Sequence, residues 1–369
     1  MHQTPKRAKH QTGWSKENKM YFEQAKQKFE NLKDKECVRV LAFESSCDET
    51  SVAVVENGRK ILSNIVSTQI PIHVRFGGVV PEVASRNHIL AISNVTKEAL
   101  AAAKLEIKDI DLVAVTYGAG LIGALLVGVN FAKALAFENN IPLVAVSHIE
   151  GHIAANYLTY PQLVPPYMCL LTSGGHTAIL KVEDYNQRTL IGSTIDDAVG
   201  ECFDKVARVL GLGYPGGPKI DKLAKEGKSE ITFCKTPLVG TYNFSFSGVK
   251  TAVINYVHNQ EQKGEEINKA DVAASFQEEV CGELVKKATR AAREYCMDKL
   301  VVAGGVSANS RLKEMLKGEC EKQNISLFMP ELGLCTDNAA MIGSAAYFMM
   351  KKGEGLSDTN LTASSVVKI

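Results

Sequence analysis

Residues 168–182 read Met-Cys-Leu-Leu-Thr-Ser-Gly-Gly-His-Thr-Ala-Ile-Leu-Lys-Val, and this stretch decides the fold. The apolar runs 168–172 and 178–182 predict the two strands of a hairpin. Between them, the pair Gly174-Gly175 predicts a tight tip whose backbone a ligand can approach closely. A single glycine pair is a weak signal. The fold is therefore inferred from the order of this hairpin and two similar turns along the chain.

Two further turns of this kind lie on either side of the central hairpin. An earlier hairpin is predicted from strands at 38–43 and 51–55, with a polar, acidic tip at 44–50. A late glycine-bearing turn at 304–309 follows an apolar strand and opens a helix, whose N-terminus favours negative charge.

The rest of the chain alternates helices and strands. Helical stretches at 87–104 and 271–297 and short strands at 112–115 and 143–146 indicate an α/β protein. The order of the three turns is that of the actin, hexokinase and Hsp70 (ASKHA) architecture. We therefore expect a two-lobed α/β fold of this type, with a duplicated βββαβα core and a nucleotide cleft between the lobes. The predicted parts are a basic N-terminal extension at 1–37, a first lobe at 38–147 plus 338–369, and a second lobe at 148–337.

Composition sets broad limits. The chain has 369 residues, of which 45% are hydrophobic, enough for two domains with their own cores. No stretch approaches the roughly 20 consecutive apolar residues of a membrane span, so we expect no membrane insertion. Nine cysteines without a Cys-x-x-Cys pair argue against a disulfide framework or a thiolate zinc site, and favour a cytoplasmic protein.

The first 37 residues differ from the rest, with nine Lys or Arg against five Asp or Glu. Residues 1–16 look disordered. A charged helix is predicted after them, and two interpretations are open: an arm that contacts RNA or a partner, or a solvated extension. The apolar residues near one face of this helix are Met20, Tyr21, Ala25, Phe29 and Leu32.

A pair of histidines, His148 and His152, suggests a metal site. Four residues apart on a helix, they lie one turn apart on one face, so both imidazoles can reach a single cation. Asp337, predicted to cap the helix at 339–343, is the candidate third ligand. Three protein ligands leave an open position that suits chemistry. The alternative is that the two histidines are only neighbours on a wet surface.

Other polar segments are weaker candidates. Asp48 and Glu49, at the first hairpin tip, could orient a metal-bound phosphate or act as a general base. The acidic cluster at 196–204 could bind a ligand or only complement a helix dipole. The turn 214–218 could place the backbone of a glycine against a ligand. The aromatic segment 242–248 could meet a nucleic-acid base, or form a strand with one buried face.

Several enzyme classes are disfavoured. The G-x-x-x-x-G-K-[ST] phosphate loop and the G-x-G-x-x-G fingerprint are absent. A zinc peptidase needs Glu directly after the first histidine or directly before the second, and these positions are Ile149 and Gly151. Glu150 would lie about 100° around the helix from each of them. A small-molecule kinase of the same architecture and a nucleotide-sensing scaffold remain as alternatives, although the paired histidines disfavour the kinase.

The chain resembles the TsaD family in motifs that occur in order between about residues 38 and 351. They are Glu-Ser-Ser-Cys-Asp-Glu-Thr at 44–50, Gly-Gly-Val-Val-Pro-Glu-Val-Ala-Ser-Arg-Asn-His at 77–88, His-Ile-Glu-Gly-His at 148–152, Ser-Gly-Gly-His-Thr at 173–177, Tyr-Pro-Gly-Gly-Pro at 214–218, Phe-Ser-Phe-Ser-Gly at 244–248 and Cys-Thr-Asp-Asn at 335–338.

The resemblance implies a tRNA N(6)-adenosine threonylcarbamoyltransferase. Such an enzyme transfers the threonylcarbamoyl group of threonylcarbamoyl-AMP to the exocyclic amine of the adenosine 3′ of the anticodon, in tRNAs reading codons that begin with A. The resemblance further implies TsaB-type and TsaE-type protein partners. It implies one divalent metal, usually Fe²⁺ and sometimes Zn²⁺, on His148, His152 and Asp337, and allows Mg²⁺ with the nucleotide. The residues implied to bind the adenylate are Leu171, Thr172, Ser173, Gly174, Gly175, Asp204, Gly217, Asp221 and Asn309.

Overall fold

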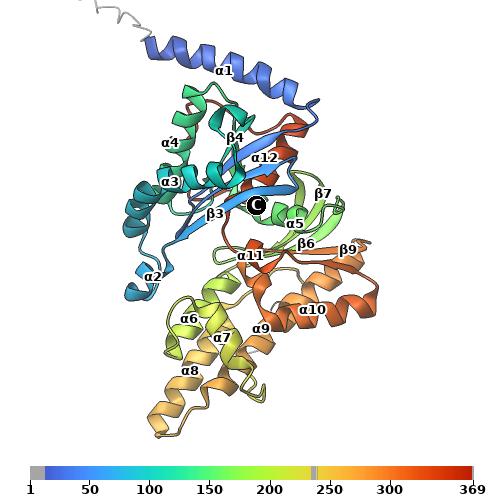
Figure 1. The fold of residues 1–369 in the computed structure, drawn as a ribbon. Helices are drawn as coiled ribbons and strands as arrows, with labels where there is room; N and C mark the ends of the chain where they lie inside the picture. Colours follow the sequence, from blue (N-terminus) through green and yellow to red (C-terminus); the bar gives the residue numbers. More distant parts are fainter. Residues whose placement is uncertain (1–12, 234–237, 239, 368–369) are drawn as a thin grey trace, which may run out of the picture.

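Two mixed β-sheets, each flanked by helices, build the protein (Figure 1). The computed structural model describes residues 13–233, 238 and 240–367. The first sheet has the strand order β11-β5-β4-β1-β2-β3, with β1 at Arg39–Glu44, β2 at Glu49–Glu56, β3 at Lys60–Thr68, β4 at Leu112–Gly118, β5 at Leu143–Ser147 and β11 at Leu356–Ser357. The second has the order β10-β9-β6-β7-β8, with β6 at Tyr167–Thr172, β7 at Thr177–Asp184, β8 at Gln187–Ser193, β9 at Lys299–Ala303 and β10 at Ser326–Phe328.

The two sheets repeat one plan. In the first, β1 pairs antiparallel with β2 and parallel with β4, and β3 extends the β2 edge. In the second, β6 pairs antiparallel with β7 and parallel with β9, and β8 extends the β7 edge. This repetition confirms the predicted duplicated core and the actin/hexokinase-like fold. The first hairpin tip is shorter than predicted, because Glu44 and Glu49 belong to the strands.

Helices cover the sheets and connect their strands. The helices flanking the first sheet are α1 at Gly13–Leu32, α2 at Ile70–His73, the 3₁₀ turn η1 at Val74–Phe76, α3 at Pro81–Ala103, η2 at Ile107–Asp109 and α4 at Ile122–Glu138. Those after β5 are α5 at His148–Thr159, α6 at Val199–Val209, α7 at Gly216–Ala224, α8 at Ser247–Lys263, α9 at Lys269–Glu294, η3 at Gly305–Ala308, α10 at Ser310–Gln323, α11 at Leu332–Cys335 and α12 at Ala339–Lys352.

Helices α5 and α12 join the two halves. One hydrophobic core contains residues of both helices together with inward-facing residues of both sheets, such as Ala42 and Leu171. The helices cross closely at Gly151, where an added Cβ would lie 2.6 Å from Ile342 Cδ1. Because these helices are buried between the sheets, residues at their N-terminal ends are held where the two halves meet.

Helix α1 packs on the first sheet's side of the molecule. Tyr21, Ala25, Phe29 and Leu32 are buried, and Tyr21 Oη donates to the Ile141 carbonyl at 2.8 Å. Met20, the first apolar residue named for this face, is 60% exposed. The helix also begins within the segment predicted to be disordered; residues 1–12 lie outside the described part of the chain. Among the described residues, no helix is both long and apolar enough to cross a membrane. The domain boundaries remain a prediction.

Candidate metal centre and active site

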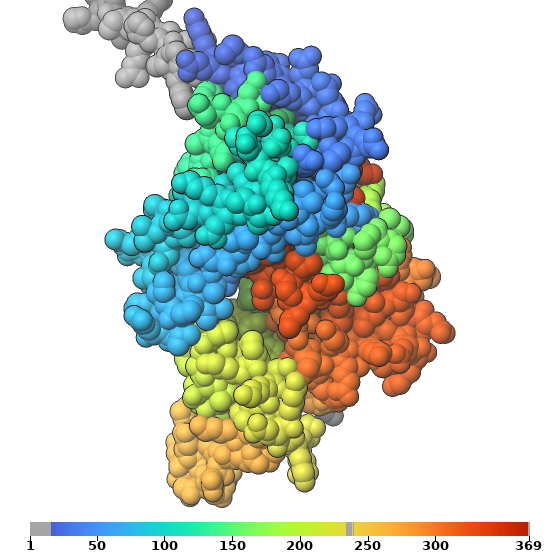
Figure 2. Space-filling view, in the orientation of Figure 1, coloured from blue at the N-terminus to red at the C-terminus, as the bar shows by residue number. Residues whose placement is uncertain are grey.

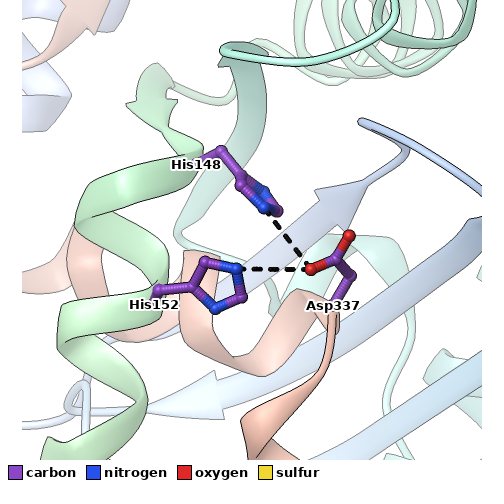
Figure 3. Close-up of side chains that lie close together, drawn as sticks. All are labelled: His148, His152 and Asp337. Atoms are coloured by element: carbon purple, nitrogen blue, oxygen red, sulfur yellow. Dashed lines mark ion pairs between the residues drawn. The ribbon is translucent and has the colours of Figure 1, made fainter. Parts of the chain in front are cut away.

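A His-His-Asp cluster lies where α5 follows β5 (Figure 3). His148 is the first residue of α5, and His152 follows one turn later on the same face. Their Nε2 atoms lie 3.4 Å and 3.3 Å from the same oxygen, Oδ1 of Asp337. The candidate ligand atoms of the three residues all lie within 4.8 Å of one another. Two imidazole nitrogens and a carboxylate oxygen are a donor set typical of Fe²⁺ and Zn²⁺ sites.

Burial excludes the alternative of two histidines on a wet surface. His148 is only 8% exposed and His152 only 2%. The prediction that Asp337 caps the following helix was wrong, because Asn338 is the N-cap of α12 and its Oδ1 accepts from Met341 N at 3.1 Å. Asp337 is therefore released from capping and its carboxylate faces the two histidines.

A fully buried carboxylate, Glu44, orients His148 from behind. Glu44 Oε2 lies 3.2 Å from His148 Nδ1 and accepts from Thr116 Oγ1 at 2.5 Å, while Oε1 accepts from Ser46 N at 2.6 Å. A carboxylate on Nδ1 fixes the tautomer that leaves Nε2 free to bind a cation. The residues alone gave no reason to single out Glu44, because its contact with His148 spans 104 positions.

The cluster is strongly coupled electrostatically. Burial disfavours a charged imidazole, but the carboxylates of Asp337 and Glu44 outweigh it and raise the pKa of His148 well above its ordinary value. Burial and the charge of His148 lower the pKa of His152. Burial works against ionised Asp337, yet His148 and His152 lower its pKa. A buried carboxylate, Glu44, and a half-buried one, Asp337, face the two imidazoles and form a site that accommodates added positive charge.

The first hairpin tip lies beside this cluster. Asp48 is buried, and its Oδ2 accepts from Tyr214 Oη at 3.2 Å. Burial, with the charges of Asp337 and Asp48, raises the pKa of Glu49 to about 9, so Glu49 is protonated at neutral pH. Of the two predicted base candidates, Asp48 therefore suits the role better.

A third histidine, His88, supports the backbone of this tip. Its Nδ1 lies 2.7 Å from Thr50 Oγ1 and its Nε2 lies 3.0 Å from the Cys47 carbonyl. The two contacts hold the chain on both sides of Asp48. His88 ends the motif at 77–88, and its sequence neighbours give no sign of this role.

The second hairpin tip approaches the cluster from the other sheet. Leu171 and Thr172 are buried at the end of β6, and Ser173 N donates to the His176 carbonyl at 2.8 Å. Burial and the charges of His148 and His152 lower the pKa of His176 to about 4.

Two glycines, Gly304 and Gly200, let neighbouring segments pack closely against the backbone of this tip. Gly304 has φ +93°, and a Cβ there would lie 2.5 Å from the Thr172 carbonyl oxygen. At the start of α6, a Cβ on Gly200 would lie 2.8 Å from Gly174 Cα. A Cβ on either Gly174 or Gly175 would meet no atom within 4 Å, so the backbone of the tip is open to a ligand.

The remaining predicted ligand-binding residues form two contacts in the second half. Asp204 accepts from Gly216 N at 2.7 Å, next to Gly217. Asp221 Oδ1 accepts from Ser310 Oγ at 2.8 Å. Asn309 caps α10 by accepting from Leu312 N at 2.9 Å, so Asp221 and Asn309 flank the start of that helix.

Two predicted clusters serve mainly structure. In the acidic cluster at 196–204, Asp196 accepts from Phe246 N, and Asp197 and Glu201 pair with lysines, which leaves Asp204 as the candidate for a ligand. In the segment 242–248, Phe244 and Phe246 are buried and stack on each other, so they are not available to a base. That segment forms one isolated bridge, not a continuous strand.

Glu150 is directed away from the histidines, as its place on the helix predicted. It forms an ion pair with Arg188 of β8. Glu150 is therefore not placed to act as a peptidase base on a metal held by these histidines.

Comparisons with known proteins agree with this arrangement. The fold and the cluster define a two-lobed actin/hexokinase-like protein with a candidate metal centre at the junction of its sheets. T. kodakarensis HypF has a similar fold, with a TM-score of 0.61 and 16% identity over 88% of this chain and 49% of that one.

Sequence similarity identifies the family. Residues 60–344 match the family described as TsaD, tRNA N6-adenosine threonylcarbamoyltransferase. The tRNA N6-adenosine threonylcarbamoyltransferase of Clostridium botulinum (strain Kyoto / Type A2) is 58% identical over 327 residues, 88% of this chain and 96% of the relative. That of Clostridium perfringens (strain 13 / Type A) is 58% identical over 326 residues, with the same coverage. The chain therefore belongs to the TsaD family and is a transferase.

Proposed function

We propose that the protein transfers the threonylcarbamoyl group of threonylcarbamoyl-AMP to the N6 amine of the adenosine 3′ of the tRNA anticodon, in tRNAs reading codons that begin with A. The observation that carries this proposal is the cluster of buried His148 and His152 with half-buried Asp337 between the two hairpin tips, in a chain of the TsaD family. Nucleoside digestion of treated tRNA, with mass spectrometry for threonylcarbamoyladenosine, tests it. If no threonylcarbamoyladenosine forms when active partner proteins are present, the proposed transfer is refuted.

The metal proposed for the cluster is one divalent cation, Fe²⁺ in the first place and Zn²⁺ in the second. The donor set fits, because two Nε2 atoms converge on one carboxylate oxygen and Glu44 supports the first imidazole from its far side. When bound, the cation would supply Lewis-acid polarisation of a carbamoyl or phosphate oxygen.

The chemistry asked of the chain is modest. Threonylcarbamoyl-AMP is a mixed anhydride, so a new N–C bond forms at N6 while the carbamoyl C–O bond to AMP breaks. The amine needs placement and loss of one proton. We propose Asp48 as the group that orients the amine or accepts this proton, since its carboxylate accepts from Tyr214 Oη and its backbone carbonyl accepts from Gln69 N. Protonated Glu49 would help to position it.

The adenylate is proposed to lie against the open backbone of the second hairpin tip. Unobstructed space at Gly174, Gly175 and Gly217 supports close approach of a phosphate or ribose. Asn309 and Asp221, at the start of α10, are proposed to contact the nucleoside. The full proposed set is Leu171, Thr172, Ser173, Gly174, Gly175, Asp204, Gly217, Asp221 and Asn309. Mg²⁺ would accompany the nucleotide only if a polyphosphate binds.

Protein partners of the TsaB and TsaE types are also proposed. Helices α3 and α4 expose the apolar side chains of Ile89, Leu90, Ile122 and Leu126, which suit a helical interface with a TsaB-type partner. Leu90→Lys should weaken that complex in size-exclusion chromatography without changing the metal content. An unchanged elution position would refute this interface.

A further inference from the structure

An exposed aromatic and two guanidinium groups border the opening between the two halves. Figure 2 shows a hollow between the light-blue segment that contains α2 and the yellow-green α6, with green atoms of the middle of the chain behind it. On the first side, η1 presents Arg75 and Phe76, and Phe76 is 59% exposed. On the second side, exposed Arg208 lies in the last turn of α6.

This border is connected directly to the candidate base. Gln69 N donates to the Asp48 carbonyl at 2.8 Å, and α2 begins at the next residue. Across the opening, Arg208 Nη2 donates to the Gly77 carbonyl at 2.8 Å. Gly77, at φ +70°, ends η1 and lets the chain turn there. The surface formed by Arg75, Phe76 and Arg208, named here the rim, is therefore joined through the short helix α2 to Gln69, which contacts the Asp48 backbone.

The rim carries two positive charges that form no ion pair among the described residues. Its neighbouring carboxylates are engaged elsewhere: Glu82 pairs with Arg86, and Glu201 pairs with Lys205. Half-buried Asp204, one turn before Arg208, accepts from Gly216 N, and its carboxylate also interacts with the charge of Arg208.

Unpaired bases stack on aromatic rings, and guanidinium groups bind phosphates. We propose that the rim binds the unpaired anticodon loop of the RNA substrate, with Phe76 stacked on a base and Arg75 and Arg208 on phosphates. This inference deepens the proposed function, on which it rests, by naming the chain's contacts to RNA. An acidic or apolar protein segment is the competing occupant and forms an outcome of the test.

The test measures RNA binding separately from transfer. Full-length protein is titrated with an unmodified tRNA with U at anticodon position 36, and with its isolated anticodon stem-loop. Phe76→Ala should weaken both complexes by about 5- to 100-fold, the range for removing one aromatic ring from beneath a stacked base, and Phe76→Trp should restore them. Arg75→Ala should lower the magnitude of the salt-dependence slope by about 0.7 for each phosphate that the protein no longer neutralises.

Matched controls lie elsewhere on the surface. Met20→Ala removes an exposed apolar side chain from α1, and Lys263→Ala removes a charge at the end of α8. Both should bind RNA as the wild type does. Arg208→Lys keeps the positive charge but alters the hydrogen bond to the Gly77 carbonyl. RNA binding like that of the wild type would show that the charge matters and not this contact between the two halves.

The outcomes separate the two proposals. Unchanged RNA affinity in Phe76→Ala and Arg75→Ala would overturn the inference, even if the wild type transfers the group. So would intact RNA binding combined with loss of stimulation by a partner protein, since the rim would then be a protein-docking surface. Weakened RNA binding in a protein that transfers nothing would support the rim while refuting the proposed transfer.

Discussion

Replacing Glu44 by glutamine tests whether this buried carboxylate tunes the metal centre. Glu44 accepts from Ser46 N and Thr116 Oγ1 and faces Nδ1 of His148 at 3.2 Å. Glutamine has only one oxygen: if it still accepts from Ser46 N, an NH₂ group faces His148, and if it faces His148 as a neutral acceptor, Ser46 N loses its partner. Outer carboxylates of this kind contribute about 10- to 100-fold to metal affinity, or about 1.4–2.7 kcal/mol. We therefore expect Glu44→Gln to bind the metal about 10- to 100-fold more weakly than the wild type does.

The measurement is competition for Zn²⁺ and for anaerobic Fe²⁺ against a chelator of known affinity. Glu106→Gln, at an exposed carboxylate, is the control and should bind metal as the wild type does. Thermal unfolding of the metal-free proteins checks that the buried substitution has not disrupted the fold. An unchanged dissociation constant in folded Glu44→Gln would refute the reasoning that the second carboxylate orients His148 for a cation.

Three further predictions concern the loops around the cluster. Gly304→Ala should destabilise the folded protein by about 1–3 kcal/mol because Gly304 has a positive φ, and the close Thr172 carbonyl should add to this penalty. Gly305→Ala, where an added Cβ meets open space, should be nearly neutral in thermal unfolding. Tyr214→Phe should lower the single-turnover transfer rate by about 5-fold or more, because the charged Asp48 loses a hydrogen bond; an unchanged rate would contradict this. Glu49→Gln should retain transfer at neutral pH. The raised pKa means that wild-type Glu49 must ionise in a buried site as pH rises from its ordinary 4.5 through about 9, so the metal-free wild type should lose stability relative to the variant over that window in denaturant titrations.

Local patterns predicted the framework well. The two apolar runs around Gly174-Gly175 became β6 and β7, and the late turn led into α10, because strand pairing and helix starts leave short-range signatures. The edge strands β3 and β8 were not predicted, since most of their residues are only partly buried and their apolar pattern is weak.

The candidate centre was predictable in part. Helical spacing brought His148 and His152 together, but the spacing could not decide between a metal site and a wet surface, because burial depends on α12 and the second sheet. Glu44 and His88 act through contacts between distant parts of the chain. Such long-range contacts carry no local pattern, so only the folded structure reveals them.

The most direct test is transfer of labelled threonine from purified threonylcarbamoyl-AMP to an unmodified tRNA with U at anticodon position 36, with and without partner proteins. The account predicts label in tRNA with the wild type, loss of transfer in His148→Ala together with loss of bound metal, and recovery of neither on adding partners to that variant. Transfer by metal-free His148→Ala at the wild-type rate would contradict it.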